Sequence, residues 1–312
     1  MNMKYPALPE SLRTERLTPP GPGKLRMVLD TDTYNEVDDQ FALCQAMLSP
    51  DRLEVEALYA APFHNSRSSG PADGMQRSYD EIRRVLKMLG KSDCCPVLKG
   101  SDRWMKPDRK PVESEAARDL IKRAKSDDKR PLYVVAIAAI TNVASAIQMD
   151  PSIIERIVVV WLGGHDHGQD ETREFNLKQD PDAARVILDS GVPFVQVPCC
   201  NVASHLNTTV AELNQYLKGK NDIGTYLADI VAGYVGKSDP YAWSKVIWDI
   251  SATSWLIEPK WLPSKLVPTP TLNDDVTWGP SKGRHLMRVV TRIQRDPIFR
   301  DVFKKITAVK TK

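Results

Sequence analysis

The segment 28–39, VLDTDTYNEVDD, places four aspartates within ten residues. Asp30 and Asp32 come at the end of a short apolar run, and Asp38 and Asp39 come after a five-residue polar stretch. Carboxylates this close raise one another's pKa and repel unless a cation lies among them. The chain has no Cys/His set with zinc-site spacing, so the donors indicate a hard cation with oxygen ligands, Ca²⁺ or Mg²⁺.

A simpler explanation of part of this cluster is helix capping. Asp38 and Asp39 stand where a helix is predicted to begin, and carboxylates are favoured at the positive end of a helix. Capping leaves Asp30 and Asp32 unexplained, so a cation or a polar substrate remains the better explanation of all four.

The elements that position these residues alternate along the chain between apolar runs of strand length and stretches of helix length. This alternation predicts an α/β fold: a doubly wound, mostly parallel central sheet flanked by helices. In such sheets the loops at the carboxyl ends of strands form the ligand site, and Asp32 lies at such an end. Strands are predicted at 25–31, 55–61, 96–100, 132–139, 156–162, 193–197, 264–270 and 285–293, and helices at 38–48, 74–90, 114–125, after Asn142, at 181–190 and over much of 205–259.

The chain has no internal break that would indicate a second domain. Residues 1–24 contain five prolines and no apolar periodicity, which predicts an extended N-terminal arm. Residues 25–312 show no composition shift, repeat or low-complexity segment, and we expect them to form a single domain.

Composition and charge exclude several classes of partner. The net charge of +3 comes from 43 basic and 40 acidic residues that are interspersed, so no basic stripe for nucleic acid is present. No apolar segment approaches the roughly 20 residues of a membrane span, and the N-terminus lacks the apolar centre of a signal peptide. We therefore expect no membrane partner and a cytoplasmic protein. The five cysteines, two pairs of them adjacent, suit neither a disulfide framework nor a metal knuckle.

One functional interpretation of the aspartates is phosphoryl transfer. VLDTDT matches the D-x-D-x-T signature of haloacid-dehalogenase-like, Mg²⁺-dependent phosphatases, in which Asp30 would be the nucleophile and Asp32 the acid and base. The later lysine and acidic pair that complete such a site have no convincing counterpart downstream.

A second interpretation uses more of the chain. LDTDTYNEVDDQFAL resembles the D-x-D-P-G-x-D-D-A-x-A-L signature of nucleoside hydrolases, which joins the first strand to the first helix. Three further segments occur in the order of that family: VVAIAAITNVASAIQMDP, VVVWLGG followed by EFNLKQDPDAA, and WDISATSWLIEP. Four ordered motifs over about residues 25–308 are far more specific than any single one.

The resemblance implies a Ca²⁺-dependent N-glycosyl hydrolase that releases base and ribose. Carried onto this chain, it implies that Asp32, Asp39, the backbone carbonyl of Ile137 and Asp249 hold the metal, with Asp32 also the general base that activates water. It further implies sugar contacts from Asp38, Asn65, Glu174 and Asn176, and a homodimer or homotetramer. Asp30 would hold the turn.

The leaving base is where the sequence departs usefully from the family. Many members have a histidine before the last calcium aspartate, where this chain has Trp248. Purine-preferring members of the family have a tryptophan at the same position, and it stacks on the base. The resemblance therefore implies a purine preference. Trp104 is a candidate second ring, and His167 is a candidate acid for the leaving base.

The metal turn is the least regular part of the resemblance. The family has three residues where this chain has five, TYNEV, between Asp32 and Asp38, and the usual proline and glycine are absent. The two-residue insertion predicts that Asp38 is displaced, or that Asn35 or Glu36 enters the pocket. A non-catalytic nucleoside or sugar binder on the same fold is therefore a third hypothesis.

Overall fold

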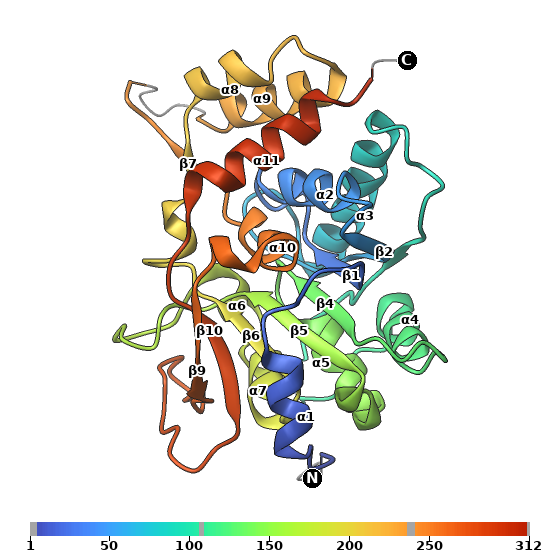
Figure 1. Cartoon of the computed structure of the whole chain (residues 1–312), viewed down its shortest axis with the longest axis vertical. Coiled ribbons are helices and arrows are strands. Elements are labelled where there is room, and N and C mark those ends of the chain that lie inside the picture. Colours follow the sequence, from blue (N-terminus) through green and yellow to red (C-terminus); the bar gives the residue numbers. More distant parts are fainter. Residues whose placement is uncertain (1–4, 106–108, 236–240, 311–312) are drawn as a thin grey trace.

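A mostly parallel sheet of eight strands forms the centre of the protein (Figure 1). The computed structural model describes residues 5–105, 109–235 and 241–310. Every neighbouring pair of strands in this sheet is parallel except the last pair, which is antiparallel. The order is β3 (Val97–Lys99), β2 (Leu53–Ala60), β1 (Leu25–Thr31), β4 (Leu132–Ala136), β5 (Ile157–Leu162), β6 (Phe194–Val197), β10 (Leu286–Val290) and β9 (Ser264–Pro268).

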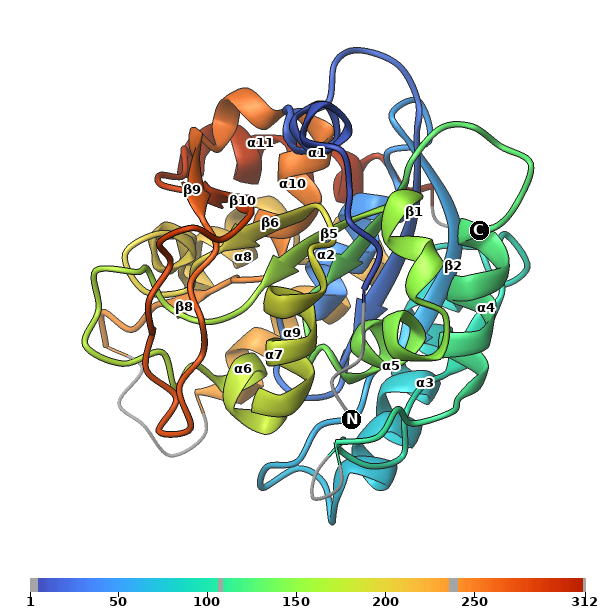
Figure 2. The ribbon, with the colours of Figure 1, turned by 90° about the horizontal axis from the view of Figure 1, so that it is seen from below.

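Helices cover both faces of this sheet (Figures 1 and 2). One apolar cluster lies under α2 (Asp39–Met47), α3 (Pro71–Met88), α9 (Asp222–Tyr234), α10 (Ile250–Ile257) and α11 (Arg295–Thr307). A second lies under α4 (Glu115–Ala124), α5 (Thr141–Met149) and α7 (Pro181–Ser190). The predicted doubly wound, mostly parallel α/β fold is confirmed. No helix in the described ranges combines the length and apolar character needed to cross a membrane.

The position of β1 follows from its sequence, LRMVLDT. It lies between β2 and β4, and Met27 and Leu29 join one apolar cluster while Val28 joins the other. A parallel strand buried on both faces has a nearly continuous apolar run, because both sets of alternating side chains face a core. The apolar run ends at Asp30, so the polar residues that follow lie at the carboxyl edge of the sheet.

Small elements before and after β6 complete this part of the chain. They are α6 (Phe175–Gln179), which precedes β6, and then β7 (Asn207–Thr208), α8 (Val210–Tyr216) and β8 (Lys245–Val246), with β7 and β8 paired antiparallel. Short 3-10 helices occupy Pro151–Glu155, Ala203–His205 and Pro259–Trp261. The strand β8 leads directly into Asp249 and α10, so this region brings the C-terminal part of the chain to the site.

The prediction of an extended N-terminal arm is wrong for residues 10–17, which form the helix α1 (Glu10–Leu17). Leu17 is fully buried, and buried Arg13 donates through Nη1 to the carbonyl of Gly191 at 2.6 Å. The helix escapes detection because Leu12 and Leu17 are its only apolar residues, too few to show a helical period. Residues 1–4 lie outside the described part of the chain.

Candidate active site

A pocket opens at the carboxyl edge of the sheet, where β1, β4, β5 and β6 end. Its volume is about 270 Å³. Four aspartates predicted from the sequence meet there, together with residues from the loops after β5 and β6. The lining residues are Asp32, Asn35, Glu36, Asp38, Asp39, Ile137, Leu162, His165, Arg173, Glu174, Phe175, Asn176, Cys199, Trp248 and Asp249.

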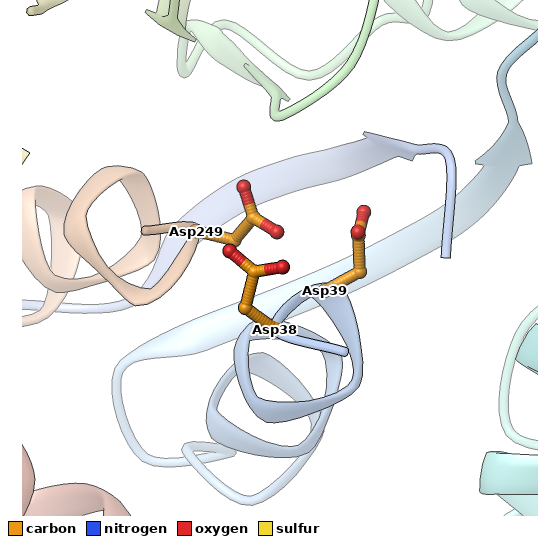
Figure 3. A group of neighbouring side chains, drawn as sticks. All are labelled: Asp38, Asp39 and Asp249. Atoms are coloured by element: carbon orange, nitrogen blue, oxygen red, sulfur yellow. The ribbon is translucent and has the colours of Figure 1, made fainter. Parts of the chain in front are cut away.

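Three of the carboxylates that line this pocket lie close together (Figure 3). Asp38 and Asp39 lie at the start of α2, and Asp249 lies at the start of α10. Each offers one oxygen such that all three oxygens lie within 4.8 Å of one another. Oxygens that bind one Ca²⁺ at 2.3–2.6 Å are spaced in this way.

These aspartates do not cap the helices that they begin. Neither Asp38 nor Asp249 accepts a side-chain capping hydrogen bond from its own helix. Instead, Asp38 Oδ2 accepts a hydrogen bond from the backbone N–H of Trp248 at 3.0 Å, and Thr31 Oγ1 donates to Asp39 Oδ1 at 2.5 Å. The capping explanation is therefore wrong for Asp38. The two helix N-termini still offset part of the negative charge, because their partial positive ends face it.

Asp32 completes the acidic group and is its most informative member. It is 1% exposed, and neither of its carboxylate oxygens has a hydrogen-bond partner among the described residues. Burial raises its pKa well above the ordinary value, and the charges of Asp39 and Asp38 raise it further. A buried carboxylate without donors is costly, and a cation beside it removes that cost. The donor set thus fits a hard divalent cation.

The roles predicted for the individual aspartates differ from the way in which the structure groups them. The closest set is Asp38, Asp39 and Asp249, whereas the prediction placed Asp38 on the sugar and Asp32 in the metal set. Asp32 and Ile137 border the same pocket, Ile137 directly after β4. Asp38 is held in this set by the N–H of Trp248, which precedes Asp249.

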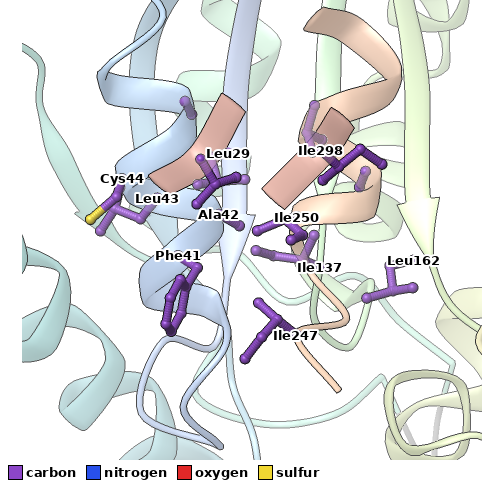
Figure 4. Close-up of a cluster of buried hydrophobic side chains, with 14 of the residues drawn as sticks. Leu29, Phe41, Ala42, Leu43, Cys44, Ile137, Leu162, Ile247, Ile250 and Ile298 are labelled. Atoms are coloured by element: carbon purple, nitrogen blue, oxygen red, sulfur yellow. The ribbon is translucent and has the colours of Figure 1, made fainter. Parts of the chain in front are cut away.

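Buried apolar side chains adjoin the residues that form the acidic group. Ile247 and Ile250 flank the Trp248–Asp249 pair and are fully buried, and Ile137 and Leu162 contribute from the ends of β4 and β5 (Figure 4). Low polarity beside the carboxylates strengthens their interactions with any bound cation.

Metal binding should change the pH dependence of stability. Burial raises the pKa of Asp39 to about 7 and of Asp38 to about 6, against an ordinary value of 3.8. In metal-free protein these carboxyls keep their protons on folding, so their contribution to stability is complete below about pH 4 and is lost as the pH rises to about 7. Ca²⁺ binds the deprotonated forms, and we expect it to raise Tm more at pH 8 than at pH 5. Calorimetric scans with Ca²⁺ or chelator at matched ionic strength measure this, and an equal or larger increase at pH 5 would contradict it.

Glu174 and Asn176 form one wall of the pocket, as predicted. Glu174 begins α6, with Oε1 accepting from the N–H of Asn176 at 2.8 Å and Oε2 from the N–H of Gly164 at 2.9 Å. Asn176 donates through Nδ2 to the carbonyl of Leu162 at 2.9 Å, and its Oδ1 accepts no hydrogen bond from the described residues. Gly164 has φ of +71°, and a Cβ there would meet Thr172 Oγ1 at 2.8 Å, so the turn requires glycine.

Of the two predicted aromatic rings, only Trp248 borders the pocket. Trp104 is half-buried and does not border the pocket. The next residue, Met105, is buried and donates from its backbone N–H to Asp180 Oδ2 at 2.9 Å. The second ring at the pocket is Phe175, between Glu174 and Asn176. The E-F-N motif contained this signal, because a residue between two site residues at a helix start shares their loop.

His167, the predicted acid for the leaving base, does not border the pocket. His167 Nε2 shares a hydrogen bond with Gln196 Oε1 at 2.9 Å, and the ring packs edge-on against Trp278. His165 lines the pocket instead, and burial lowers its pKa. His165 directly follows the Gly163–Gly164 pair after β5, so closeness to the strand end was the better guide.

Asn65 does not border the pocket and instead contacts the inserted turn, residues 33–37. Its Nδ2 donates to Asn35 Oδ1 at 2.6 Å, and its Oδ1 accepts from the N–H of Arg67 at 2.8 Å. Asn35 and Glu36, both from the five-residue stretch TYNEV that contains the insertion, border the cavity. The prediction that inserted residues enter the pocket is therefore confirmed.

Comparison with known proteins identifies the family. The sequence model of the inosine-uridine preferring nucleoside hydrolases matches residues 27–300. The chain belongs to this family. The matched span contains all four motifs and leaves α1 outside.

Relatives and solved structures of nucleoside hydrolases agree with this assignment. The pyrimidine-specific ribonucleoside hydrolase RihA of Salmonella paratyphi A is 24% identical over 264 residues, which cover 76% of this chain and 80% of the relative. A plant nucleoside hydrolase, PpNRh1, superposes with a TM-score of 0.74 at 20% identity, covering 92% of this chain and all of that one. A purine-preferring ribonucleoside hydrolase from Gardnerella vaginalis gives 0.72 at 21% identity, covering 91% and 98%.

As a nucleoside hydrolase, the chain is an N-glycosyl hydrolase rather than a phosphatase. Asp30, the nucleophile in the phosphatase interpretation, is fully buried and does not border the pocket. Its Oδ1 accepts a hydrogen bond from Asn142 Nδ2 at 2.7 Å, which ties the end of β1 to α5.

Proposed function

We propose that this nucleoside hydrolase cleaves the N-glycosidic bond of ribonucleosides in a Ca²⁺-dependent reaction and prefers purines. The observation that carries the proposal is the partnerless carboxylate of Asp32 beside Asp38, Asp39 and Asp249 in the pocket. Ca²⁺ takes about six to eight oxygen ligands in loose geometry, so these carboxylates and the Ile137 carbonyl suit it.

The sugar would lie between the acidic group and the wall formed by Glu174 and Asn176. Asn176 Oδ1 is available to accept from a hydroxyl. Three backbone N–H groups donate to Glu174, two of them to Oε2, so Oε1 retains one acceptor position. When bound, Ca²⁺ would hold sugar hydroxyls and polarise a water molecule.

Asp32 is the group that we assign as general base. Cleavage of an N-glycosidic bond passes through an oxocarbenium-like state, which the surrounding carboxylates stabilise. Asp32 has both oxygens free to accept the proton of the attacking water, unlike Asp38 and Asp39, each of which already accepts one hydrogen bond.

The purine preference rests on Trp248 and Phe175. Replacing Trp248 with leucine should raise KM for inosine or adenosine about tenfold, because stacking a base on an aromatic ring contributes on the order of 1–3 kcal/mol. Its backbone N–H, which holds Asp38, is kept. Trp248→Phe should restore most of the loss, and Trp243→Leu, outside the pocket lining, should leave KM unchanged. A similar rise for uridine would contradict the preference.

A panel of purine and pyrimidine nucleosides with Ca²⁺, and with chelator as control, tests the activity. Release of free ribose that stops on chelation supports the proposal. Nucleoside binding by calorimetry without turnover would support the non-catalytic binder instead. The homodimer or homotetramer implied by the resemblance stays a prediction, and light scattering measures it.

A further inference from the structure

A buried ion pair joins the inserted turn to the strand that leads to Asp249. Lys245 Nζ donates to Glu36 Oε2 at 2.6 Å and to the carbonyl of Val246 at 2.8 Å. Tyr234 of α9 donates from its hydroxyl to Glu36 Oε1 at 3.1 Å. Arg67 Nη1 donates to the backbone carbonyl of Glu36 at 2.8 Å. Residues from three separate segments therefore fix Glu36.

This arrangement differs from an ordinary surface ion pair. The Lys245 side chain is 7% exposed, so its charge is removed from water at a cost that needs compensation. The Glu36 side chain is 32% exposed and borders the pocket. Glu36 is thus the more accessible member of the pair, and it is the one that borders the cavity.

The donors that the described residues offer leave part of the acceptor capacity of the Glu36 carboxylate unused. A carboxylate offers about four lone-pair sites, and Lys245 and Tyr234 use one on each oxygen. Glu36 does not belong to the close group formed by Asp38, Asp39 and Asp249. The free positions therefore suit a hydroxyl donor of a neutral ligand better than a shared cation.

We propose that Glu36 is a further substrate-binding residue, which accepts a hydrogen bond from one hydroxyl of the sugar, and that Lys245 is the positioning residue that holds it. The inference rests on the proposed function and adds a contact that the inserted turn gives to this chain. Because an acceptor-only group gains nothing from a sugar that lacks the matching hydroxyl, Glu36 would select one hydroxylation pattern.

The test compares Glu36→Gln with wild type and keeps Lys245, because Lys245 also interacts with the charge of Asp38 in the acidic group. The expected result is a loss of affinity of roughly tenfold or more for ribonucleosides. For one of the 2′-, 3′- or 5′-deoxy analogues, which lacks the hydroxyl that Glu36 binds, the loss should vanish. An equal loss for all analogues, or no loss for any ligand, would overturn the proposal.

Lys245→Met alone separates positioning from direct contact. Because Lys245 also interacts with Asp38, the comparison is made at saturating Ca²⁺, where the cation holds that carboxylate. Under this condition Lys245→Met should lower ribonucleoside affinity in the wild-type background and add nothing in the Glu36→Gln background. An additive further loss would show that Lys245 acts independently and would overturn its role. The matched control is Lys218→Met, which breaks a half-exposed pair with Asp229, 2.9 Å long, outside the pocket lining.

Calorimetry of Ca²⁺ alone and of ribose with Ca²⁺ gives readouts that need no turnover. Glu36→Gln should bind Ca²⁺ within about threefold of wild type and ribose roughly tenfold more weakly. A Ca²⁺ loss on the order of 100-fold would make Glu36 a metal ligand and overturn the proposal. If wild type hydrolyses no nucleoside, the proposed function fails, while ribose and nucleoside binding still decide the role of Glu36.

Discussion

Asp32→Asn is expected to lower kcat for nucleoside hydrolysis by on the order of 10³- to 10⁴-fold, with the protein still folded. A general base contributes about 10²- to 10⁴-fold, and the same carboxylate borders the metal group. Asparagine keeps the shape of the side chain but cannot accept the proton of the attacking water. Because Asp32 is buried without a partner, removing its charge should not lower the Tm of metal-free protein. Steady-state kinetics at saturating Ca²⁺, with a thermal scan, measure both.

Two further aspartates control this experiment. Asp182→Asn changes a buried aspartate of α7 that pairs with Arg185 outside the pocket lining, and kcat should stay within about threefold. Asp30→Asn should also lower kcat much less than Asp32→Asn, since Asp30 only accepts from Asn142. A sharper loss in Asp30→Asn than in Asp32→Asn would contradict the assignment of the base.

Asp249→Asn is expected to weaken Ca²⁺ binding by about 100-fold or more. Asp249 is 4% exposed and supplies one of the three closest oxygens, so its loss removes both a ligand and a charge. Substitutions that only disturb residues around metal ligands already cost roughly 10- to 100-fold, and a direct ligand should cost at least as much. Titration calorimetry with Ca²⁺ on chelator-treated protein measures the change.

Activity at high Ca²⁺ then distinguishes loss of activity through weaker metal binding from loss of activity through loss of the general base. If Asp249 only holds the metal, excess Ca²⁺ should recover part of kcat in Asp249→Asn but none in Asp32→Asn. Ca²⁺ affinity equal to wild type, combined with lost activity, would remove Asp249 from the metal set. Asp182→Asn again serves as the control, with unchanged Ca²⁺ affinity expected.

Much of the fold was predictable because local patterns and tertiary packing agree. The run LRMVLDT is apolar on both faces of a strand that packs on both faces, so period and burial give the same answer. The helix α1 was not predictable, because Leu17 and Arg13 are buried by distant partners such as Gly191 rather than by an amphipathic pattern.

The site was predictable where residues directly follow strands or belong to a motif. Asp32, Ile137 and Glu174 reach the pocket for that reason. The sequence did not show which group each of these side chains would contact. The place of Asp38 depends on the N–H of Trp248, 210 positions along the chain, and only the folded chain shows that contact.

The same separation constrains how the protein can form. Asp38 and Asp39 come from the first strand-to-helix turn and Asp249 from the entry to α10, so neither half of the chain carries a binding site by itself. The site is complete only after the strands of the parallel sheet have paired and the segment that ends in α10 has packed against α2. Contacts this far apart in sequence form late and slowly, because their loops are expensive to close. During synthesis, the chain therefore cannot use its metal to guide folding until almost all of it has been made.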